Sequence, residues 1–124
     1  MSGVTYDTGM LIGIDRRSHR ATAIHEWLRE ERITVTVPWI VVAEFWRGRT
    51  DRRDAILRSV DVEAPSVRLA KNAGLALGSV RQATIADAIV MASAALRGDV
   101  VYTSDMGDLG RLQRHFPSVR LIGI

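Results

Sequence analysis

The sequence predicts a single α/β domain over residues 1–124, with helices in two layers around a mostly parallel central sheet. Three observations lead to this fold class. Short apolar segments with β-strand character alternate with helical patterns along the whole chain. A chain of 124 residues fits one domain that buries about two-thirds of its unfolded surface. Neither a linker nor a low-complexity stretch divides it.

The N-terminal segments predict a strand followed by two helices. Val4–Tyr6 is a short strand pattern that ends at Asp7, and Thr8–Ile14 is a turn leading into a brief helix. A second helix is expected to begin at Ser18. The apolar residues that we expect on its buried face are Ala23, Ile24, Trp27 and Leu28.

The middle of the chain predicts another strand and two further helices. The β-branched residues of Ile33–Val37 indicate a strand, and Pro38 is tolerated in the first turn of a helix that we expect over Trp39–Arg47. Asp51 is expected to cap a helix that ends near Ser59, and Val60–Val62 is a candidate strand.

The last part of the chain repeats the alternation. Ser66–Gly78 and Thr84–Leu96 are Ala- and Leu-rich helical patterns, and Gly98 closes the second. The remaining expected elements are the strand Val100–Thr103, the helix Asp108–His115 and the strand Val119–Ile122.

Composition narrows the class of protein. The absence of cysteine excludes disulfide bonds and a thiolate zinc site. No apolar run approaches the roughly 20 residues of a membrane span, and we expect a cytoplasmic protein with no membrane partner. The sequence pI is about 10.2 because Lys71 is the only lysine among the 17 basic residues. Arginine suits phosphate contacts and therefore RNA, although GC-biased codon usage also enriches arginine.

Four carboxylates occupy positions that a solvated surface does not explain. Asp7 ends an apolar strand and Asp105 follows another, so both are expected at the carboxyl edge of a parallel sheet, where α/β domains place their sites. Glu44 and Asp87 each lie within an apolar run. Asp108 follows Asp105 by about one helical turn.

Each carboxylate also has a structural explanation. Asp87 stands three residues after Thr84, so the pair could form a capping box. Asp105 or Asp108 could cap the next helix, and Asp7 could be a turn residue at the end of its strand. Glu44 has the fewest structural uses, and capping does not exclude metal binding.

Converging carboxylates require compensation. Two unit charges about 4 Å apart repel by roughly 4 kcal/mol at an effective dielectric near 20. Either their pKa values rise or divalent cations neutralise them. Carboxylate oxygens without cysteine or a nearby histidine favour Mg²⁺ or Mn²⁺, which points to phosphodiester chemistry. His19, His25 and His115 fall outside the acidic motifs and support no competing mechanism.

Taken in order, the acidic motifs resemble those of PIN-domain ribonucleases, and their spacing and the total length are similar to the VapC toxins of toxin–antitoxin systems. The resemblance covers essentially the whole chain. The segments that carry it are Tyr6-Asp7-Thr8, Val42-Ala43-Glu44, Thr84-Ile85-Ala86-Asp87-Ala88 and Thr103-Ser104-Asp105-Met106-Gly107-Asp108.

The resemblance implies a three-layer α/β/α PIN-like domain acting as an Mg²⁺- or Mn²⁺-dependent endoribonuclease. It also implies a homodimer that a cognate antitoxin silences. The residues that match the catalytic and metal-binding quartet are Asp7, Glu44, Asp87 and Asp105, with Thr8, Thr103, Ser104 and Asp108 as supporting residues. Gly9 departs from the family, which often has Ser or Asn there.

Further expectations concern the mechanism and the substrate. A cation held chiefly by Asp7 and Asp87, with Asp105 assisting, would lower the pKa of an attacking water. Glu44 would bind a second ion or orient that water. Arg47 and Arg49 could hold flanking RNA phosphates.

Other classes compete with this hypothesis. Asp7-Thr8-Gly9 spells the aspartic-protease triplet, but those folds are all-β. The alternative that we keep is a non-catalytic PIN-like module that binds RNA or protein.

Three aromatic residues crowd the Glu44 segment, and they have two explanations. Trp39, Phe45 and Trp46 either pack in the core or form part of an exposed apolar groove. Such a groove would suit an amphipathic antitoxin segment.

Overall fold

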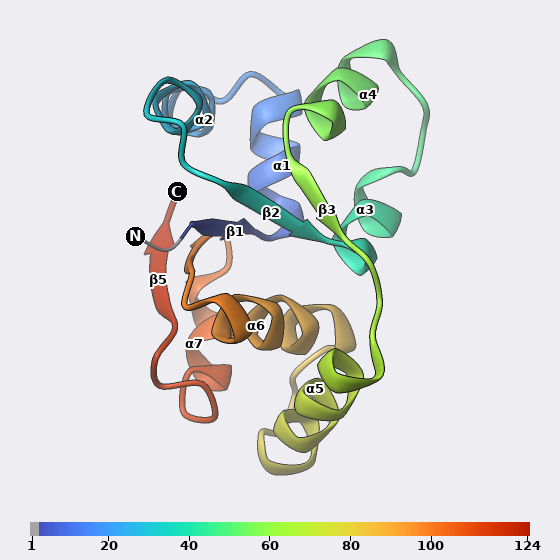
Figure 1. Cartoon of the computed structure of the whole chain (residues 1–124), viewed down its shortest axis with the longest axis vertical. Helices are drawn as coiled ribbons and strands as arrows, with labels where there is room; N and C mark the ends of the chain where they lie inside the picture. The colour runs from blue at the N-terminus through green and yellow to red at the C-terminus, as the bar shows by residue number, and fades with distance from the viewer. Residues whose placement is uncertain (1–2) are drawn as a thin grey trace.

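The computed structural model describes residues 3–124, which form three layers around a five-stranded sheet (Figure 1). All strand pairs are parallel, and the strand order is β3-β2-β1-β4-β5. The strands are β1 (Val4–Tyr6), β2 (Val35–Pro38), β3 (Asp61–Glu63), β4 (Val100–Thr103) and β5 (Arg120–Gly123). The predicted α/β/α fold with a parallel sheet is confirmed.

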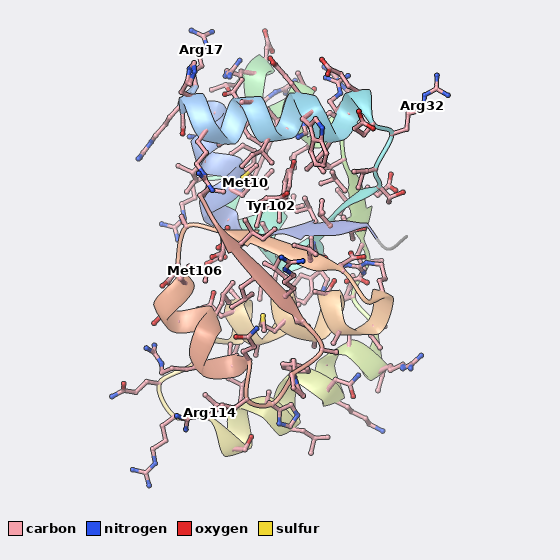
Figure 2. The ribbon with its side chains drawn as sticks, turned by 90° about the vertical axis from the view of Figure 1, so that its left-hand side faces the viewer. Met10, Arg17, Arg32, Tyr102, Met106 and Arg114 are labelled. Atoms are coloured by element: carbon pink, nitrogen blue, oxygen red, sulfur yellow. The ribbon has the colours of Figure 1, made fainter. Side chains whose placement is uncertain are left out.

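Helices cover both faces of this sheet. Figure 1 shows α1, α2 and α4 on one side and α5, α6 and α7 on the other, and Figure 2 shows the same separation after a quarter turn. The helices are α1 (Thr8–Asp15), α2 (His19–Glu30), α3 (Trp39–Phe45), α4 (Asp51–Arg58), α5 (Val67–Ser79), α6 (Ile85–Arg97) and α7 (Met106–Leu112).

The core lies between the sheet and these helices. Every residue of β1 and β2 is buried, as expected for central strands covered on both faces. Helix α6 is embedded against the sheet, and all seven residues from Ala88 to Ala94 are buried. Thr84 caps its N-terminus, and Gly98 ends it with a φ of 70° in the left-handed region. These two caps fix where α6 begins, and so they fix the position of Asp87.

The expected apolar face of α2 was only partly correct: Leu28 is buried and Ile24 packs against the core, but the other two residues are exposed. Ala21, His25 and Leu28 are the buried residues of this helix, whereas Ala23 is exposed and Trp27 is 48% exposed. Residues 21, 25 and 28 also form a helical stripe, so periodicity alone did not determine the rotation of the helix. The hydrogen bond between Tyr6 and His25 accompanies the observed rotation.

The bounds of three helices also differ from those expected. Helix α3 ends at Phe45 rather than Arg47, and Thr50 rather than Asp51 caps α4. Helix α7 begins at Met106 and ends at Leu112, so His115 lies beyond it. Helix α7 begins earlier than expected because the Asp105 carboxylate accepts a hydrogen bond from the backbone amide of Asp108 and so caps the helix.

Within residues 3–124, no helix combines the length and the apolar character needed to cross a bilayer.

Candidate active site

The sheet changes its direction of winding between β1 and β4. These strands are neighbours, and the chain leaves β1 into α1 on one face but leaves β4 into α7 on the opposite face (Figure 1). Such a switch point leaves a crevice beyond the carboxyl ends of the two strands. Asp7 and Ser104 directly follow β1 and β4, so both lie at this crevice.

A pocket of about 160 Å³ occupies the crevice, and we call it the acidic pocket. It brings together side chains from segments far apart in the sequence. Its lining residues are Asp7, Thr8, Gly9, Glu44, Asp87, Val90, Ser104 and Asp105. The four acids that were picked out from the sequence therefore line one pocket.

Asp7 is held at the base of the acidic pocket and is only 6% exposed. Its Oδ1 accepts a hydrogen bond of 2.9 Å from the Met10 amide, and its Oδ2 accepts one from the Thr103 hydroxyl. Burial raises the pKa of Asp7, and the charge of Asp105 adds to this rise, although the hydrogen bonds oppose it. Hydrogen bonds thus hold the Asp7 carboxylate in place, but they do not fully compensate its negative charge.

Glu44 enters the pocket from the last turn of α3, which directly follows β2. The Thr8 hydroxyl donates a 2.6 Å hydrogen bond to Glu44 Oε1. This contact joins α1 to α3 and orients the carboxylate. Thr8, which the resemblance gave as a supporting residue, therefore contacts Glu44 directly.

Asp87 lies in the first turn of α6. Its backbone amide donates a 3.1 Å hydrogen bond to the Thr84 hydroxyl, so the capping interaction is real. Its carboxylate nevertheless lines the acidic pocket. Burial, together with the charges of Asp105, Asp108 and Asp7, raises the pKa of Asp87 to about 6. The cap and the acidic site coexist at this residue.

Asp105 links β4 to α7 and approaches two other acids. Its own amide donates a 2.8 Å hydrogen bond to Thr103 Oγ1. One carboxylate oxygen from each of Asp87, Asp105 and Asp108 lies within 4.8 Å of the others. Hydrogen bonds with Asp105 and Arg111 lower the pKa of Asp108. The closest set of acids thus includes Asp108, which was expected only to support the site, and does not include Asp7.

This donor set fits a hard divalent cation. The oxygens are carboxylates, with hydroxyls from Thr8 and Ser104 beside them, and no cysteine exists in the chain. Burial raises the pKa of both Asp7 and Asp87, and within residues 3–124 neither carboxylate has an ion-pair partner that would compensate its charge. A bound Mg²⁺ or Mn²⁺ would supply that compensation.

The pocket wall contains a residue that sequence reasoning missed. Val90 follows Asp87 by three residues and so lies on the same face of α6. The i, i+3 spacing was a signal that could have identified it.

The aromatic cluster near Glu44 splits between core and surface. Phe45 is 2% exposed and belongs to the core, and Trp39 is partly buried against it. Trp46 is 37% exposed. A groove formed by all three residues is therefore excluded, and only Trp46 offers substantial surface. Arg47 and Arg49 are exposed in the segment between α3 and α4 and do not line the acidic pocket.

The fold and the pocket together define a class: a three-layer α/β/α domain with an acidic cluster at the switch point of a parallel sheet. No protein-family model and no curated protein matches the sequence. Solved structures do match over nearly the whole chain.

The structures to which this chain is similar are complexes. One is VapBC2 from Rickettsia felis bound to a fragment of its promoter DNA, with 15% identity, a TM-score of 0.79 and 98% of each chain covered. Another is a toxin–antitoxin complex from Klebsiella pneumoniae, with 19% identity, a TM-score of 0.75, and 94% of this chain and 95% of the other covered.

A third is DNA-bound VapBC from Salmonella typhimurium, with 16% identity, a TM-score of 0.72, and 99% of this chain and 98% of the other covered. The chain thus has the fold found in these toxin–antitoxin complexes, which confirms the PIN-like fold that the resemblance implied. At these sequence identities, the comparison shows similarity of fold alone.

Proposed function

We propose that this chain is a metal-dependent endoribonuclease toxin that hydrolyses RNA phosphodiester bonds and is neutralised by a cognate antitoxin. The observation that carries the proposal is the acidic pocket, which Asp7, Glu44, Asp87 and Asp105 line together. Its position at the carboxyl edge of the sheet is where α/β domains hold substrates. The fold of toxin–antitoxin complexes supports the same function.

In this proposal Asp7 and Asp87 are the principal metal ligands, with Asp105 and Glu44 completing the site. Bound Mg²⁺ or Mn²⁺ would supply Lewis-acid activation of water and stabilise charge on the phosphate. Thr103 positions Asp7 by a hydrogen bond, and Thr8 positions Glu44 in the same way. Asp108 lies close enough to Asp87 and Asp105 to share in cation binding.

Glu44 has a second task in the proposed reaction, in addition to completing the metal site. It enters from α3, whereas Asp87 and Asp105 enter from α6 and from the end of β4. A carboxylate on a different wall of the pocket can accept a proton from the attacking water as its oxygen bonds to phosphorus. The bond from phosphorus to the 3′ oxygen breaks, and that oxygen leaves as a hydroxyl after taking a proton from solvent. The Thr8 hydroxyl keeps one Glu44 oxygen fixed, which leaves the other free to act.

The partners follow from the same proposal. The chain acts in the cytoplasm as a homodimer, and an antitoxin segment covers the acidic pocket and excludes RNA. Trp46 supplies exposed aromatic surface only two residues from Glu44 and is the contact that we assign to the antitoxin. An antitoxin arginine reaching the carboxylates would compete with the cation.

The decisive experiment measures RNA cleavage and metal binding on the same purified protein. Cleavage of single-stranded RNA is expected with Mg²⁺ or Mn²⁺ and is expected to stop with EDTA. Mg²⁺ should also raise the melting temperature of the wild type, since it binds the folded state only. Asp7→Asn should remove both effects, whereas the control Asp61→Asn, an exposed acid on β3, should retain both.

The outcomes separate catalysis from a binding module. Cleavage that continues in EDTA would contradict the metal mechanism. RNA or antitoxin binding without cleavage, under any of these cations, would instead identify a non-catalytic PIN-like module.

A further inference from the structure

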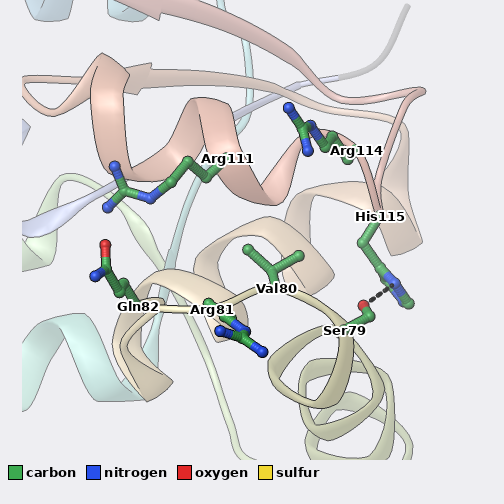
Figure 3. A pocket seen from close by; sticks show the side chains of 7 residues that line it. All are labelled: Ser79, Val80, Arg81, Gln82, Arg111, Arg114 and His115. Atoms are coloured by element: carbon green, nitrogen blue, oxygen red, sulfur yellow. Dashed lines mark hydrogen bonds between the residues drawn. The ribbon is translucent and has the colours of Figure 1, made fainter.

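A second pocket lies between the segment joining α5 to α6 and the C-terminal end of α7 (Figure 3). Its volume is about 750 Å³, within the range of roughly 300–1,000 Å³ typical of ligand sites. We call it the arginine pocket, and it is lined by Ser79, Val80, Arg81, Gln82, Arg111, Arg114 and His115. It contains none of the residues that line the acidic pocket.

The lining of the arginine pocket is strongly cationic. Three of its seven residues are arginines, and none is an acid. Among residues 3–124, Arg81 and Arg114 form no ion pair, so their guanidinium groups are available to a ligand. Guanidinium groups bind phosphate oxygens through two parallel hydrogen bonds. The pocket therefore favours an anion with several charged oxygens.

Neutral donors and a fixed wall complete the arginine pocket. Figure 3 shows Arg111 and Gln82 on one side and the hydrogen-bonded pair Ser79 and His115 on the other. The Ser79 hydroxyl oxygen and His115 Nδ1 are 3.2 Å apart, which ties the end of α5 to the segment after α7. The His115 ring also packs edge-on against Phe116 at 4.8 Å. These contacts give the pocket a defined shape.

One ion pair joins the arginine pocket to an acid that neighbours the acidic pocket. Arg111 contacts Asp108, one helical turn earlier on α7, and Asp108 belongs to the closest set of acids. A polyanion that reaches the acidic pocket meets repulsion from its carboxylates. Arg111 and the other arginines of the arginine pocket would offset that repulsion for the neighbouring charges of the same polyanion.

We infer that the arginine pocket binds RNA backbone phosphates next to the scissile phosphodiester. This inference rests on the proposed ribonuclease function and names a substrate contact for it. Arg81 and Arg114 hold the flanking phosphates, and Gln82 and His115 offer hydrogen bonds to the backbone or to a base. The site is separate from Arg47 and Arg49, which lie beyond α3.

An acidic protein segment is the competing ligand, and the geometry favours RNA. A uniformly acidic peptide that fills the arginine pocket gains nothing from the acidic pocket, because its own carboxylates would be repelled there. RNA needs both features, since one phosphate must enter the acidic pocket while its neighbours require neutralisation. The Arg111–Asp108 contact links the arginine pocket to the acids at the N-terminal end of α7, where Asp105 enters the acidic pocket.

The test uses Arg81→Gln/Arg114→Gln and the charge-matched control Arg16→Gln/Arg68→Gln, whose side chains are exposed elsewhere. The probe is a fluorescently labelled single-stranded RNA of mixed sequence, with EDTA present to prevent cleavage. The pocket variant should bind RNA about tenfold more weakly or worse. The slope of log affinity against log salt should become shallower by about 1.4, as expected when two phosphate contacts to a single strand are lost.

Both double variants should keep the wild-type melting temperature, because the replaced side chains form no ion pairs within residues 3–124. Equal RNA affinity and equal salt slope in the pocket and control variants would overturn the inference. It would also be overturned if the wild type bound no RNA, or if the pocket variant lost affinity only for polyglutamate.

Cleavage assays with Mg²⁺ separate this inference from the proposed function. A raised KM with a nearly unchanged kcat is expected for the pocket variant, because flanking contacts serve ground state and transition state alike. If the pocket variant cleaved RNA with the KM of the wild type, only the inference about the arginine pocket would be refuted. If the wild type cleaved no RNA but bound it more tightly than the pocket variant does, only the proposed nuclease function would be refuted.

Discussion

Gly9 and Ser104 approach each other so closely that position 9 has no room for a side chain. A Cβ on Gly9 would stand 1.7 Å from the Ser104 hydroxyl oxygen and 2.8 Å from the Ser104 Cβ. Both residues line the acidic pocket, one from α1 and one from the end of β4. The glycine that departs from the family pattern is therefore matched to its neighbour.

Gly9→Ala should push Ser104 outward and displace Asp105 beside it. We expect a loss of about 1–3 kcal/mol in unfolding free energy, as for other overpacked sites, together with weaker Mg²⁺ binding. Chemical denaturation and thermal shift with Mg²⁺ measure the two effects. Gly9→Ala/Ser104→Gly should recover most of the loss, because it removes the clashing Cβ. A double variant no better than the single one would contradict this explanation.

Asp87→Asn should stabilise the metal-free protein while abolishing cleavage. Burial and neighbouring acids raise the pKa of Asp87 from 3.8 to about 6. The folded state therefore binds the proton more tightly, and this contribution is complete below pH 3.8 and lost as the pH rises to about 6. At pH 7 in EDTA, the variant should be more stable by about 1–2 kcal/mol after allowance for solvent screening.

Denaturation of both proteins from pH 4 to pH 8 tests this expectation, and the stability difference should shrink towards the acid end. If Asp87 acted only at the helix N-terminus, the variant would instead lose about 1 kcal/mol and keep its activity.

Tyr6 and His25 should contribute a measurable pH dependence of their own. The Tyr6 hydroxyl and His25 Nδ1 are 2.8 Å apart, and His25 Nε2 lies 3.0 Å from the Ser59 hydroxyl. Burial lowers the pKa of His25 below 6.5, with help from the charge of Arg29. A base with a lowered pKa stabilises the fold above 6.5, and that stability is lost as the pH falls through its folded-state pKa.

His25→Gln should therefore show a flatter loss of stability than the wild type when the pH falls below 6.5. Tyr6→Phe should cost about 1–3 kcal/mol, because it leaves a ring nitrogen without its partner. Identical stability curves for His25→Gln and the wild type would show that His25 does not titrate on unfolding.

Trp46→Ala should weaken the antitoxin complex, and Trp27→Ala provides a matched control. The two tryptophans are 37% and 48% exposed, but only Trp46 lies beside the Glu44 segment. We expect a loss of about 2 kcal/mol or more in binding free energy for Trp46→Ala, as for an aromatic hot spot. Isothermal titration of each folded variant with the separately purified antitoxin measures this loss of binding free energy. Equal affinity of both variants would place the antitoxin elsewhere.

Local patterns in the sequence were sufficient for much of this protein. The alternation of strand and helix segments predicted the parallel sheet, and Thr84, Gly98 and Ser66 marked helix ends that the structure has. The positions of Asp7 and Asp105 after apolar strands indicated the carboxyl edge of the sheet. These features are encoded by residues close together in the chain, so a single sequence reveals them.

Only the tertiary structure decided which side of each element faces its neighbours. It turned His25 rather than Trp27 into the core, added Asp108 to the closest acids, and set Gly9 against Ser104. It also gathered Arg81, Arg111 and Arg114 into one pocket, although they come from separate segments. Such contacts depend on how helices rotate and pack across long sequence separations, which periodicity and capping signals leave undetermined.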